Sequence, residues 1–544
     1  MILKKRMDSP FPASYQRKWG YIDKIGVAVS SVKEGRMIKK LYKIFTSRMF
    51  WMLLIFGLQF VGLATIVLWS AVTKAYYLFF MGLSLVMGVI IITRKENNAY
   101  RLMWMFVIII FPFLGGVLYL LFANKKIGAL SEKKIADFKR RQPDETDFSL
   151  ENADKELCET SPVFRRQSQY VKNVTGFSAW KNTEVKYFDR GADFFPDLLE
   201  NVKKAEKFIF VEYFIIDQGK WWNRILEVLK EKVREGVDVR VVFDDMGSIN
   251  VLPRGYDKIL QSYGIKAMAF NKIKFHVNPR LNFRDHRKIF DIDGNICYTG
   301  GVNLADEYSN DIVKFGYWKD DAIRLTGSAC WNFTLMFLRN WDCLTKEWDP
   351  LDRFLPTIKG KDDGFVQAFD DSPLDDNTIA EDTYLQIINH AKKYVWITTP
   401  YLILDEPMEA TLKIAAKSGV DVRIITPHYP DKKSVFEVTR SNYESLLKAG
   451  VKIYEFTPGF IHSKNFISDD EIAVVGTTNL DYRSFYLHFE LSVLFFRSSI
   501  VEDLKNNFEN TLQLCQEIHV GDEGRLPLLR RIFRGAARIM SPLF

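Results

Sequence analysis

The chain has 544 residues, of which 47% are hydrophobic and 26% charged, so it can form several domains and is not a disordered protein. Its five cysteines show no CxxC pair and no zinc-binding spacing, which excludes a disulfide-rich scaffold and favours a reducing compartment. The net charge of +8 is unevenly distributed: residues 1–49 carry +9, residues 50–126 carry +5, residues 525–544 carry +5 and the remaining 127–524 carry −11. A nucleic-acid-binding protein would carry its positive charge on the working domain, whereas basic ends suit an anionic membrane surface.

The N-terminal quarter of the chain is predicted to be embedded in a membrane. A basic arm (1–48) is followed by residues 49–124, which contain three stretches without a charged residue: 49–73, 75–93 and 102–124. Each approaches or exceeds the roughly 20 apolar residues that a bilayer crossing needs. The alternative, a set of buried helices in a soluble core, would require a very large core in a short piece of chain.

The topology of these stretches remains open. The arm, the loop around Arg94 and Lys95, and the exit at Lys125 and Lys126 are all basic, and the positive-inside rule would place all three in the cytosol. Three full crossings cannot satisfy that rule. Either the charge rule fails here or the stretch 102–124, which is interrupted by Pro112 and two glycines, turns back within the membrane.

Residues 125–180 are polar and mixed, which is typical of a linker that packs on the segment that follows. Beyond it the sequence repeats itself: 205–213 is echoed by 391–399, 236–242 by 419–425 and 263–266 by 449–452. Each copy alternates buried strands with helices, which predicts an α/β fold with parallel strands. We therefore expect two homologous domains, 181–350 and 351–520, followed by a basic amphipathic tail, 521–544.

Each repeat ends in the same pattern, HxKxxxxD, followed by a turn of small residues and an asparagine. The predicted catalytic set is His286, Lys288 and Asp293 in the first repeat and His462, Lys464 and Asp469 in the second. Two matches at equivalent places in a repeat are not a chance occurrence. On a strand, His and Lys two positions apart project from the same face. The two aspartates have the opposite parity and lie where a turn would form, so we expect them to brace the site rather than react.

The residue types in this pattern suit phosphate chemistry. Two lysines and two asparagines offer positive charge and amide donors, and we predict a phosphate-binding set of Lys288, Asn303, Lys464 and Asn479. Two histidines suit covalent catalysis, in which one attacks phosphorus and the other protonates the leaving alcohol. No cofactor is expected, and no metal, because carboxylates and His/Cys pairs do not cluster around the motifs.

A histidine nucleophile must be neutral and oriented, which calls for a carboxylate or carbonyl on its other ring nitrogen. Glu490 follows the second motif and Asp320 follows the first, and these are the candidate supporting residues, with Glu307 or Asp321 as alternatives to Asp320.

The paired motifs resemble those of the phospholipase D superfamily. The hydrophobic N-terminal segment and the runs 282–288, 398–401 and 476–484 are similar to those of bacterial cardiolipin synthases, a resemblance that covers residues 50–544. It implies two phospholipase D-like α/β sandwich domains that form one pseudo-symmetric catalytic unit, preceded by membrane helices. It further implies condensation of two phosphatidylglycerols into cardiolipin and glycerol through a phosphatidyl-histidine. The expected partners are membrane phospholipids and not nucleic acid, at the bacterial cell (inner) membrane, with the catalytic domains in the cytoplasm.

Several alternatives stay open. We favour His286 as nucleophile and His462 as acid/base, but pseudo-symmetry allows the reverse. The same site could use water, as a phospholipase D, or another alcohol as acceptor, while a nuclease or an inactive membrane scaffold fits the sequence less well. The tail could lie among lipid headgroups or pack on the protein. A homo-oligomer is compatible with the sequence. The remaining histidines are expected to have no catalytic role: His276, His390, His428, His488 and His519.

Overall fold

The computed structural model describes residues 57, 61, 71–93, 97–111, 114–116, 118–119, 153–272, 282–374, 377–522 and 527–543. The predicted basic arm (1–48), nearly all of the first hydrophobic stretch, residues 125–152 and His276 lie outside this part of the chain. The chain divides into two compact units, residues 1–95 with 104–119 and residues 96–103 with 120–544.

In the first unit, helix α3 (Ala71–Thr93) covers the second hydrophobic stretch. From Leu78 onward it exposes most of its large apolar side chains, including Phe79, Leu85 and Val89. Across the residues that the structure describes, no helix combines the length and the apolar character needed to cross a membrane.

Helix α4 (Asn98–Ile110) begins the third hydrophobic stretch and ends just before Pro112. A Cβ atom on Gly115 would lie 2.7 Å from the Ile108 Cα, so the residues after the helix approach its last turns closely. Whether the stretch 102–124 turns back, as the sequence predicts, is not tested by this contact. A turn within a bilayer remains a prediction.

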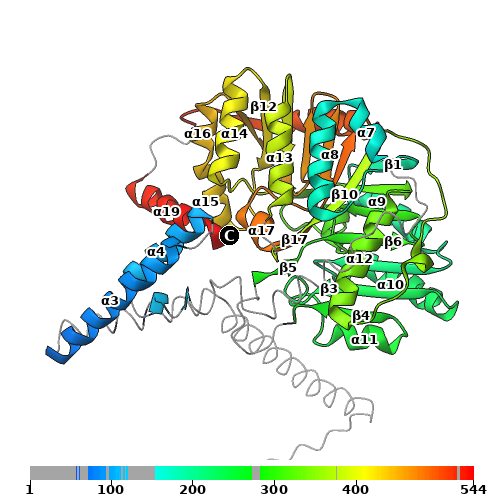
Figure 1. Cartoon of the computed structure of the whole chain (residues 1–544), viewed down its shortest axis with the longest axis horizontal. Helices are drawn as coiled ribbons and strands as arrows, with labels where there is room; N and C mark the ends of the chain where they lie inside the picture. Colours follow the sequence, from blue (N-terminus) through cyan, green and yellow to red (C-terminus); the bar gives the residue numbers. More distant parts are fainter. Residues whose placement is uncertain are drawn as a thin grey trace, which may run out of the picture. The chain divides into compact units, whose positions relative to one another are not determined.

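Two sheets of matching strand order dominate the second unit (Figure 1). The first has the order β1-β9-β7-β6-β2-β3-β4. Its strands in chain order are β1 (Thr183–Phe188), β2 (Phe208–Tyr213), β3 (Asp238–Asp244), β4 (Lys266–Phe270), β6 (Lys288–Ile292), β7 (Ile296–Gly300) and β9 (Ala322–Gly327). Strands β2, β3 and β4 are parallel, as the sequence predicts, and the other pairs are antiparallel, so the sheet is mixed.

The second sheet repeats this order strand for strand, as β10-β17-β16-β15-β11-β12-β13, and adds β18 at its edge. Its strands are β10 (Phe365–Asp371), β11 (Tyr394–Thr398), β12 (Asp421–Pro427), β13 (Lys452–Phe456), β15 (Asn465–Ser468), β16 (Ile472–Gly476), β17 (His488–Phe496) and β18 (Cys515–Ile518). Again the three strands β11, β12 and β13 are parallel. The sequence repeat therefore corresponds to one topology built twice.

Helices cover both sheets, because their apolar residues recur every three or four positions on one face. On α10, for example, Trp222, Ile225 and Leu229 are buried. The helices of the first repeat are α9 (Gly191–Val202), α10 (Lys220–Arg234), α11 (Tyr256–Ser262) and α12 (Cys330–Thr345). Those of the second are α13 (Ile379–His390), α14 (Glu406–Lys417), α15 (Lys433–Ser441), α16 (Tyr443–Leu447), α17 (Tyr482–Tyr486) and α18 (Ile500–Leu512), and α19 (Leu528–Ile539) lies in the tail. Short 3-10 turns are η2 (Asp306–Ser309), η3 (Leu351–Phe354) and η4 (Ser541–Leu543).

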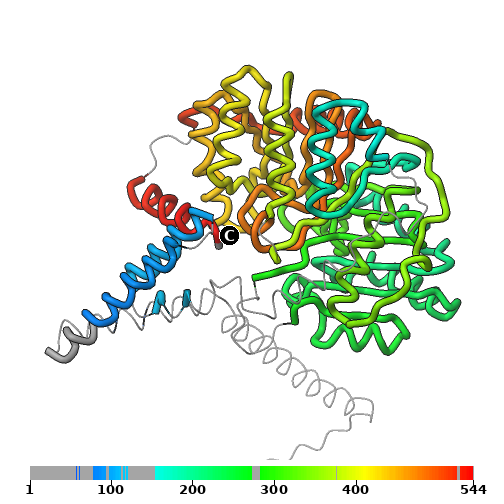
Figure 2. Tube along the Cα trace, viewed as in Figure 1, coloured from blue at the N-terminus to red at the C-terminus, as the bar shows by residue number. Residues whose placement is uncertain are grey.

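The described part of the predicted linker packs on the second repeat. Helix α8 (Pro162–Thr175) lies beside α13, and α7 (Asp154–Thr160) lies beside α8, as Figures 1 and 2 show. The Gln167 side chain donates to the Thr383 backbone carbonyl, and the Tyr170 hydroxyl donates to the Asp382 carboxylate. The segment that leads into the first repeat thus covers the second.

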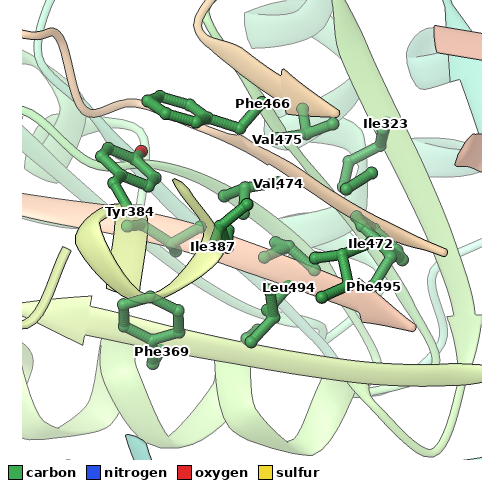
Figure 3. Packing of buried hydrophobic residues seen from close by; sticks show 14 of the residues in the cluster. Ile323, Phe369, Tyr384, Ile387, Phe466, Ile472, Val474, Val475, Leu494 and Phe495 are labelled. Atoms are coloured by element: carbon green, nitrogen blue, oxygen red, sulfur yellow. The ribbon is translucent and has the colours of Figure 1, made fainter. Parts of the chain in front are cut away.

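The two sheets share one apolar core. Figure 3 shows Ile323 of β9, in the first sheet, near Ile472 and Val475 of β16 in the second. Helix α12 is buried along most of its length within the same cluster. Burial of apolar area is the main stabilising force in folding, so the two repeats are joined by a core rather than by a surface contact.

Candidate active site

Each motif histidine lies at the start of its hairpin. Lys288 is the first residue of β6 and Lys464 immediately precedes β15, with a histidine two positions before each lysine. All four side chains are buried. The Lys288 ammonium donates to the His286 backbone carbonyl at 2.6 Å, and the Lys464 ammonium donates in the same way to the His462 carbonyl.

Short strands that cross between the repeats bring the two motifs together. Strand β5 (Arg284–Asp285) pairs in parallel with the start of β17, and β14 (Gly459–Ile461) pairs in parallel with β8 (Tyr317–Lys319). As a result the His286 N–H donates to the Phe489 carbonyl at 2.9 Å, and the His462 N–H donates to the Lys319 carbonyl at 2.7 Å. Each motif histidine is therefore held against a strand of the other repeat.

The same crossing supplies each histidine with a carboxylate. His286 Nδ1 lies 2.9 Å from Glu490 Oε2, and His462 Nδ1 lies 2.6 Å from Asp320 Oδ2. A carboxylate on Nδ1 orients the imidazole and favours the tautomer that leaves the opposite nitrogen unprotonated. Both supporting residues named from the sequence thus contact a motif histidine, each across the repeat boundary.

The alternatives to Asp320 have other partners. Glu307 forms an ion pair with Lys314 at 2.7 Å, and Asp321 accepts a hydrogen bond from the Tyr187 hydroxyl at 2.9 Å.

Charges of both motifs act on each of the two motif histidines. The pKa of His286 is held well below its usual value. Burial is the largest cause, and the charges of Lys288, Lys464 and His462 add to it. Burial, followed by Lys464, Lys288 and Lys432, does the same to the pKa of His462. Both imidazoles are therefore neutral at neutral pH, as a nucleophile requires. Burial also lowers the pKa of Lys288 to about 7 and that of Lys464 to about 8.

The motif aspartates lie at the other end of their hairpins. Asp293 follows β6, has a φ of 57°, and accepts hydrogen bonds from three successive backbone N–H groups, those of residues 206–208, at 2.7 to 2.8 Å. Asp469 has a φ of 55° and accepts from the N–H groups of residues 392–394 at 2.6 to 2.9 Å. Of the six residues in the predicted catalytic set, these two occupy bracing positions and do not contact the histidines.

The two asparagines are buried beside the site, but the bonds they form are partly structural. Asn303 Oδ1 accepts from the Ile215 N–H at 3.1 Å, while its amide donates to the Tyr308 hydroxyl at 2.5 Å. Asn479 Oδ1 has no hydrogen-bond partner among the described residues. Their part in phosphate binding remains a prediction.

His488, for which no catalytic role was expected, lies beside the motif histidine His286. Its ring centroid lies 5.5 Å from that of His286, and its Nδ1 lies 3.4 Å from Glu490 Oε1. Arg483 Nε donates to the His488 Nε2 at 3.3 Å. The available signal was that His488 precedes Glu490 by two positions, so both side chains lie on one face of a strand.

No role was predicted for Gly301 and Thr477, which occupy equivalent positions in the two repeats, each beside one of the two carboxylates. The Thr477 hydroxyl donates to Glu490 Oε2. A Cβ atom on Gly301 would collide with the Asp320 carboxylate, so only glycine leaves room for Asp320 in its present place.

Three side chains in the site have the composition of a metal site. His286, His488 and Glu490 each offer one ligand atom, and these atoms lie within 4.8 Å of one another. Imidazole and carboxylate ligands of this kind suit zinc. His286 and Glu490 already form a hydrogen-bonded pair, which explains their proximity without an ion.

Two family models match parts of this chain. Residues 198–311 and 384–512 match the family model described as "Cardiolipin synthase, PLD-like domain", and residues 82–124 match "Phospholipase_D-nuclease N-terminal". A cardiolipin synthase of Alkalihalophilus pseudofirmus is 35% identical over 463 residues, which are 84% of this chain and 91% of the relative. The chain belongs to the cardiolipin synthase family, which has phospholipase D-like domains.

Two further relatives extend this comparison. Cardiolipin synthase 2 of Bacillus anthracis is 34% identical over 84% of this chain and 89% of its own length. An uncharacterized protein of Streptococcus mutans is 41% identical over 83% of this chain and 98% of its own length. Among solved structures, a phosphatidylserine synthase of Haemophilus influenzae aligns with a TM-score of 0.53 and 13% identity over 70% of this chain and 100% of that one. At that identity the likeness concerns the fold.

Proposed function

We propose that this protein transfers a phosphatidyl group from one phosphatidylglycerol to a second, and so forms cardiolipin and glycerol. The observation that carries the proposal is a single buried site with two neutral histidines, each bound to a carboxylate of the other repeat and each close to both motif lysines. Membership of the cardiolipin synthase family supplies the reaction type.

In the first step, the nitrogen of His286 opposite Glu490 attacks the phosphorus of one phosphatidylglycerol. A P–N bond forms, the P–O bond to glycerol breaks, and protonated His462 gives its proton to the departing glycerol oxygen. The phosphate carries the negative charge throughout, and Lys288 and Lys464 stabilise the additional charge that develops on its oxygens. Because bound phosphate favours the charged form of its neighbours, it raises the pKa of His462, which takes up a proton from solvent as the substrate binds.

In the second step, His462 is neutral and acts as a base. It takes the proton from a glycerol hydroxyl of the second phosphatidylglycerol, whose oxygen attacks the phosphatidyl-histidine. The P–N bond breaks, cardiolipin leaves, and both histidines return to their starting states. We assign His286 as the nucleophile because its carboxylate partner, Glu490, is itself held in place. Glu490 accepts a hydrogen bond from Thr477 and lies near His488. The reverse assignment exchanges the two roles without other change.

We place the protein at the bacterial cell membrane, with residues 49–124 embedded and the domains 181–350 and 351–520 on the cytoplasmic side. The large apolar side chains exposed along α3 support this placement, as do the match of residues 82–124 to the N-terminal family model and the basic flanks of the hydrophobic stretches. We assign the basic arm 1–48 to the cytoplasmic surface for the same electrostatic reason.

The direct test is mass spectrometry of lipids after incubation of the purified full-length protein with phosphatidylglycerol vesicles, with and without EDTA. Cardiolipin with an equal amount of free glycerol, unaffected by EDTA, is the expected result. Phosphatidic acid without cardiolipin would show that water is the acceptor, and the proposed reaction would be wrong. Loss of activity with EDTA would overturn the metal-free mechanism.

A second experiment assigns the two histidines. With prolonged incubation, His462→Asn should form a phosphatidyl-histidine at residue 286 slowly and retain it, because this variant lacks both the acid of the first step and the base of the second. His286→Asn should form no adduct. Peptide mass spectrometry locates the label. His519→Asn, an exposed histidine, is the matched control and should turn over normally. A label at residue 462 in His286→Asn would reverse the assignment.

A further inference from the structure

The C-terminal helix α19 presents a continuous apolar face to solvent. Leu529 is 81% exposed, Leu528 69%, Ile532 59% and Phe533 51%, values that are unusual for large aliphatic and aromatic side chains. Spacings of three and four residues put these side chains on one face of the helix. Twelve residues of helix span about 18 Å, so this face is large enough to interact with more than a single side chain.

The opposite face of α19 is attached to the second repeat through its arginines. Arg530 and Arg534 both bind Glu437 of α15, at 2.7 and 2.8 Å, and Arg538 binds Glu409 of α14 at 3.2 Å. Burial works to raise the pKa of Glu437, but the hydrogen bonds from the two arginines outweigh it and hold that pKa below its usual value.

An apolar contact adds to these ion pairs. Ala537 of α19 is buried in a small cluster with Val435 and Val438 of α15 and Tyr482 of α17. The sequence left open whether the tail packs on the protein or lies among lipid headgroups. In the structure the helix packs on the protein through its basic face and leaves its apolar face uncovered. The orientation is fixed, because three separate contacts hold the helix along its length.

We propose that α19 is an interfacial helix whose exposed apolar face enters the boundary between headgroups and acyl chains of the anionic bilayer that holds the substrate. This inference rests on the proposed function, since that function places the substrate in a bilayer. A helix that buries such a face in the interface gains affinity from apolar area and from attraction to anionic lipid. Arg531, exposed beside the apolar face, and the net charge of +5 on residues 525–544 supply that attraction.

The location of α19 in the second unit favours a membrane over a protein partner. The cluster that receives Ala537 also contacts Ala99 and Tyr486, and the Asn97 amide donates to the Tyr486 hydroxyl at 2.9 Å. The chain at residues 97–99 leads directly into the third hydrophobic stretch. The helix thus lies beside the point where the predicted membrane segment joins the second unit.

The arrangement also relates the lipid surface to the chemistry. Tyr482 and Tyr486 are the ends of α17, a helix between Asn479 and His488. A helix fixed against α17 and immersed at the bilayer surface would hold the active site at a constant height above the headgroups. Phosphatidylglycerol could then reach the site without leaving the lipid layer completely.

The first test uses photo-crosslinking in the full-length protein reconstituted in phosphatidylglycerol nanodiscs. Leu529→p-benzoylphenylalanine should form adducts with phospholipid that mass spectrometry detects. Val520→p-benzoylphenylalanine, which replaces an exposed apolar residue on the loop after β18, is the matched control and should not. A Leu529 crosslink to a second copy of the chain or to another part of the same chain, or the absence of any lipid adduct, would overturn the proposal.

The second test separates this inference from the proposed reaction. The double variant Leu529→Asp, Ile532→Asp should synthesise cardiolipin about tenfold more slowly than wild type in bilayers, and at the wild-type rate on phosphatidylglycerol dispersed in detergent. Val520→Asp should behave as wild type in both. Equal activity of the double variant in bilayers would overturn the interfacial role. If wild type formed no cardiolipin in either format, the proposed reaction would be wrong. The crosslinking result would still show whether the apolar face of α19 contacts lipid.

Discussion

His286 Nδ1 lies 2.9 Å from Glu490 Oε2, so a histidine of the first repeat is oriented by a carboxylate of the second. The reciprocal pair, His462 Nδ1 and Asp320 Oδ2, lies at 2.6 Å. Neither repeat therefore contains a complete half-site. The crossing strands that produce this exchange also make the active site depend on correct docking of the two domains.

We expect Glu490→Gln and Asp320→Asn each to lower kcat by about 10²- to 10⁴-fold with little change in folding, because an amide no longer fixes the imidazole in its reactive tautomer. Lipid mass spectrometry gives the rate, and circular dichroism checks the fold. Glu307→Gln, which removes a carboxylate bound to Lys314 rather than to a histidine, is the control and should retain most activity. If Glu307→Gln were as inactive as Asp320→Asn, the pairing would not explain the loss.

Replacement of Asp293 or Asp469 by asparagine should reduce stability rather than catalysis. Each carboxylate accepts three backbone hydrogen bonds, and loss of such charge-assisted bonds should lower the free energy of unfolding by about 2–4 kcal/mol. Thermal unfolding measures the loss, and activity per folded molecule should stay near that of wild type. Glu444→Gln breaks an exposed ion pair with Lys448 and should cost about 0.5 kcal/mol or less. Inactivation of stable Asp293→Asn or Asp469→Asn would assign these residues to the chemistry instead.

Gly301→Ala should inactivate the enzyme through a single methyl group. The new Cβ would collide with the Asp320 carboxylate and displace it from His462, whereas the equivalent position in the other half, Thr477, accommodates a side chain. We expect a loss in kcat comparable to that of Asp320→Asn. Thr477→Ala removes a hydrogen bond to Glu490 and serves as the comparison, with a smaller loss of about tenfold. Normal activity of Gly301→Ala would show that Asp320 can move without consequence.

The pH profile of kcat/KM should fall on the alkaline side. Burial lowers the pKa of Lys288 to about 7 and that of Lys464 to about 8 in the unliganded site. The lysines are charged below these values and lose charge above them, so phosphate binding should weaken as pH rises through this range. In kcat the decline should move to higher pH, since bound phosphate stabilises the ammonium groups.

Lys288→Arg provides a check on this profile, because a guanidinium stays charged throughout the range. Whatever activity this variant keeps should lack the decline near pH 7. Assays on detergent-dispersed phosphatidylglycerol at constant ionic strength avoid effects of pH on vesicles. A wild-type kcat/KM that is flat between about pH 6 and pH 9 would contradict the lowered lysine pKa values.

The sequence by itself determined the features that depend on neighbouring residues. The repeat predicted two α/β domains, and the two-residue spacing of His286 and Lys288 predicted that both side chains face one site. The positions of Asp293 and Asp469 likewise predicted a bracing role, because each lies in a turn and an odd number of residues from the motif histidine, on the opposite face of a strand. The same reasoning could have reached His488 from Glu490, but a lone histidine is more often structural.

Only the tertiary structure decided which partner each residue has. His286 and Glu490 are separated by 204 positions in the chain, and His462 and Asp320 by 142, so no local pattern relates them. The clash that requires glycine at 301 and the attachment of α19 through Arg530, Arg534 and Arg538 also depend on residues that are far apart in the chain. Each depends on how the packed elements bring distant side chains within a few ångströms, and that distance is set by the shared core of the two sheets.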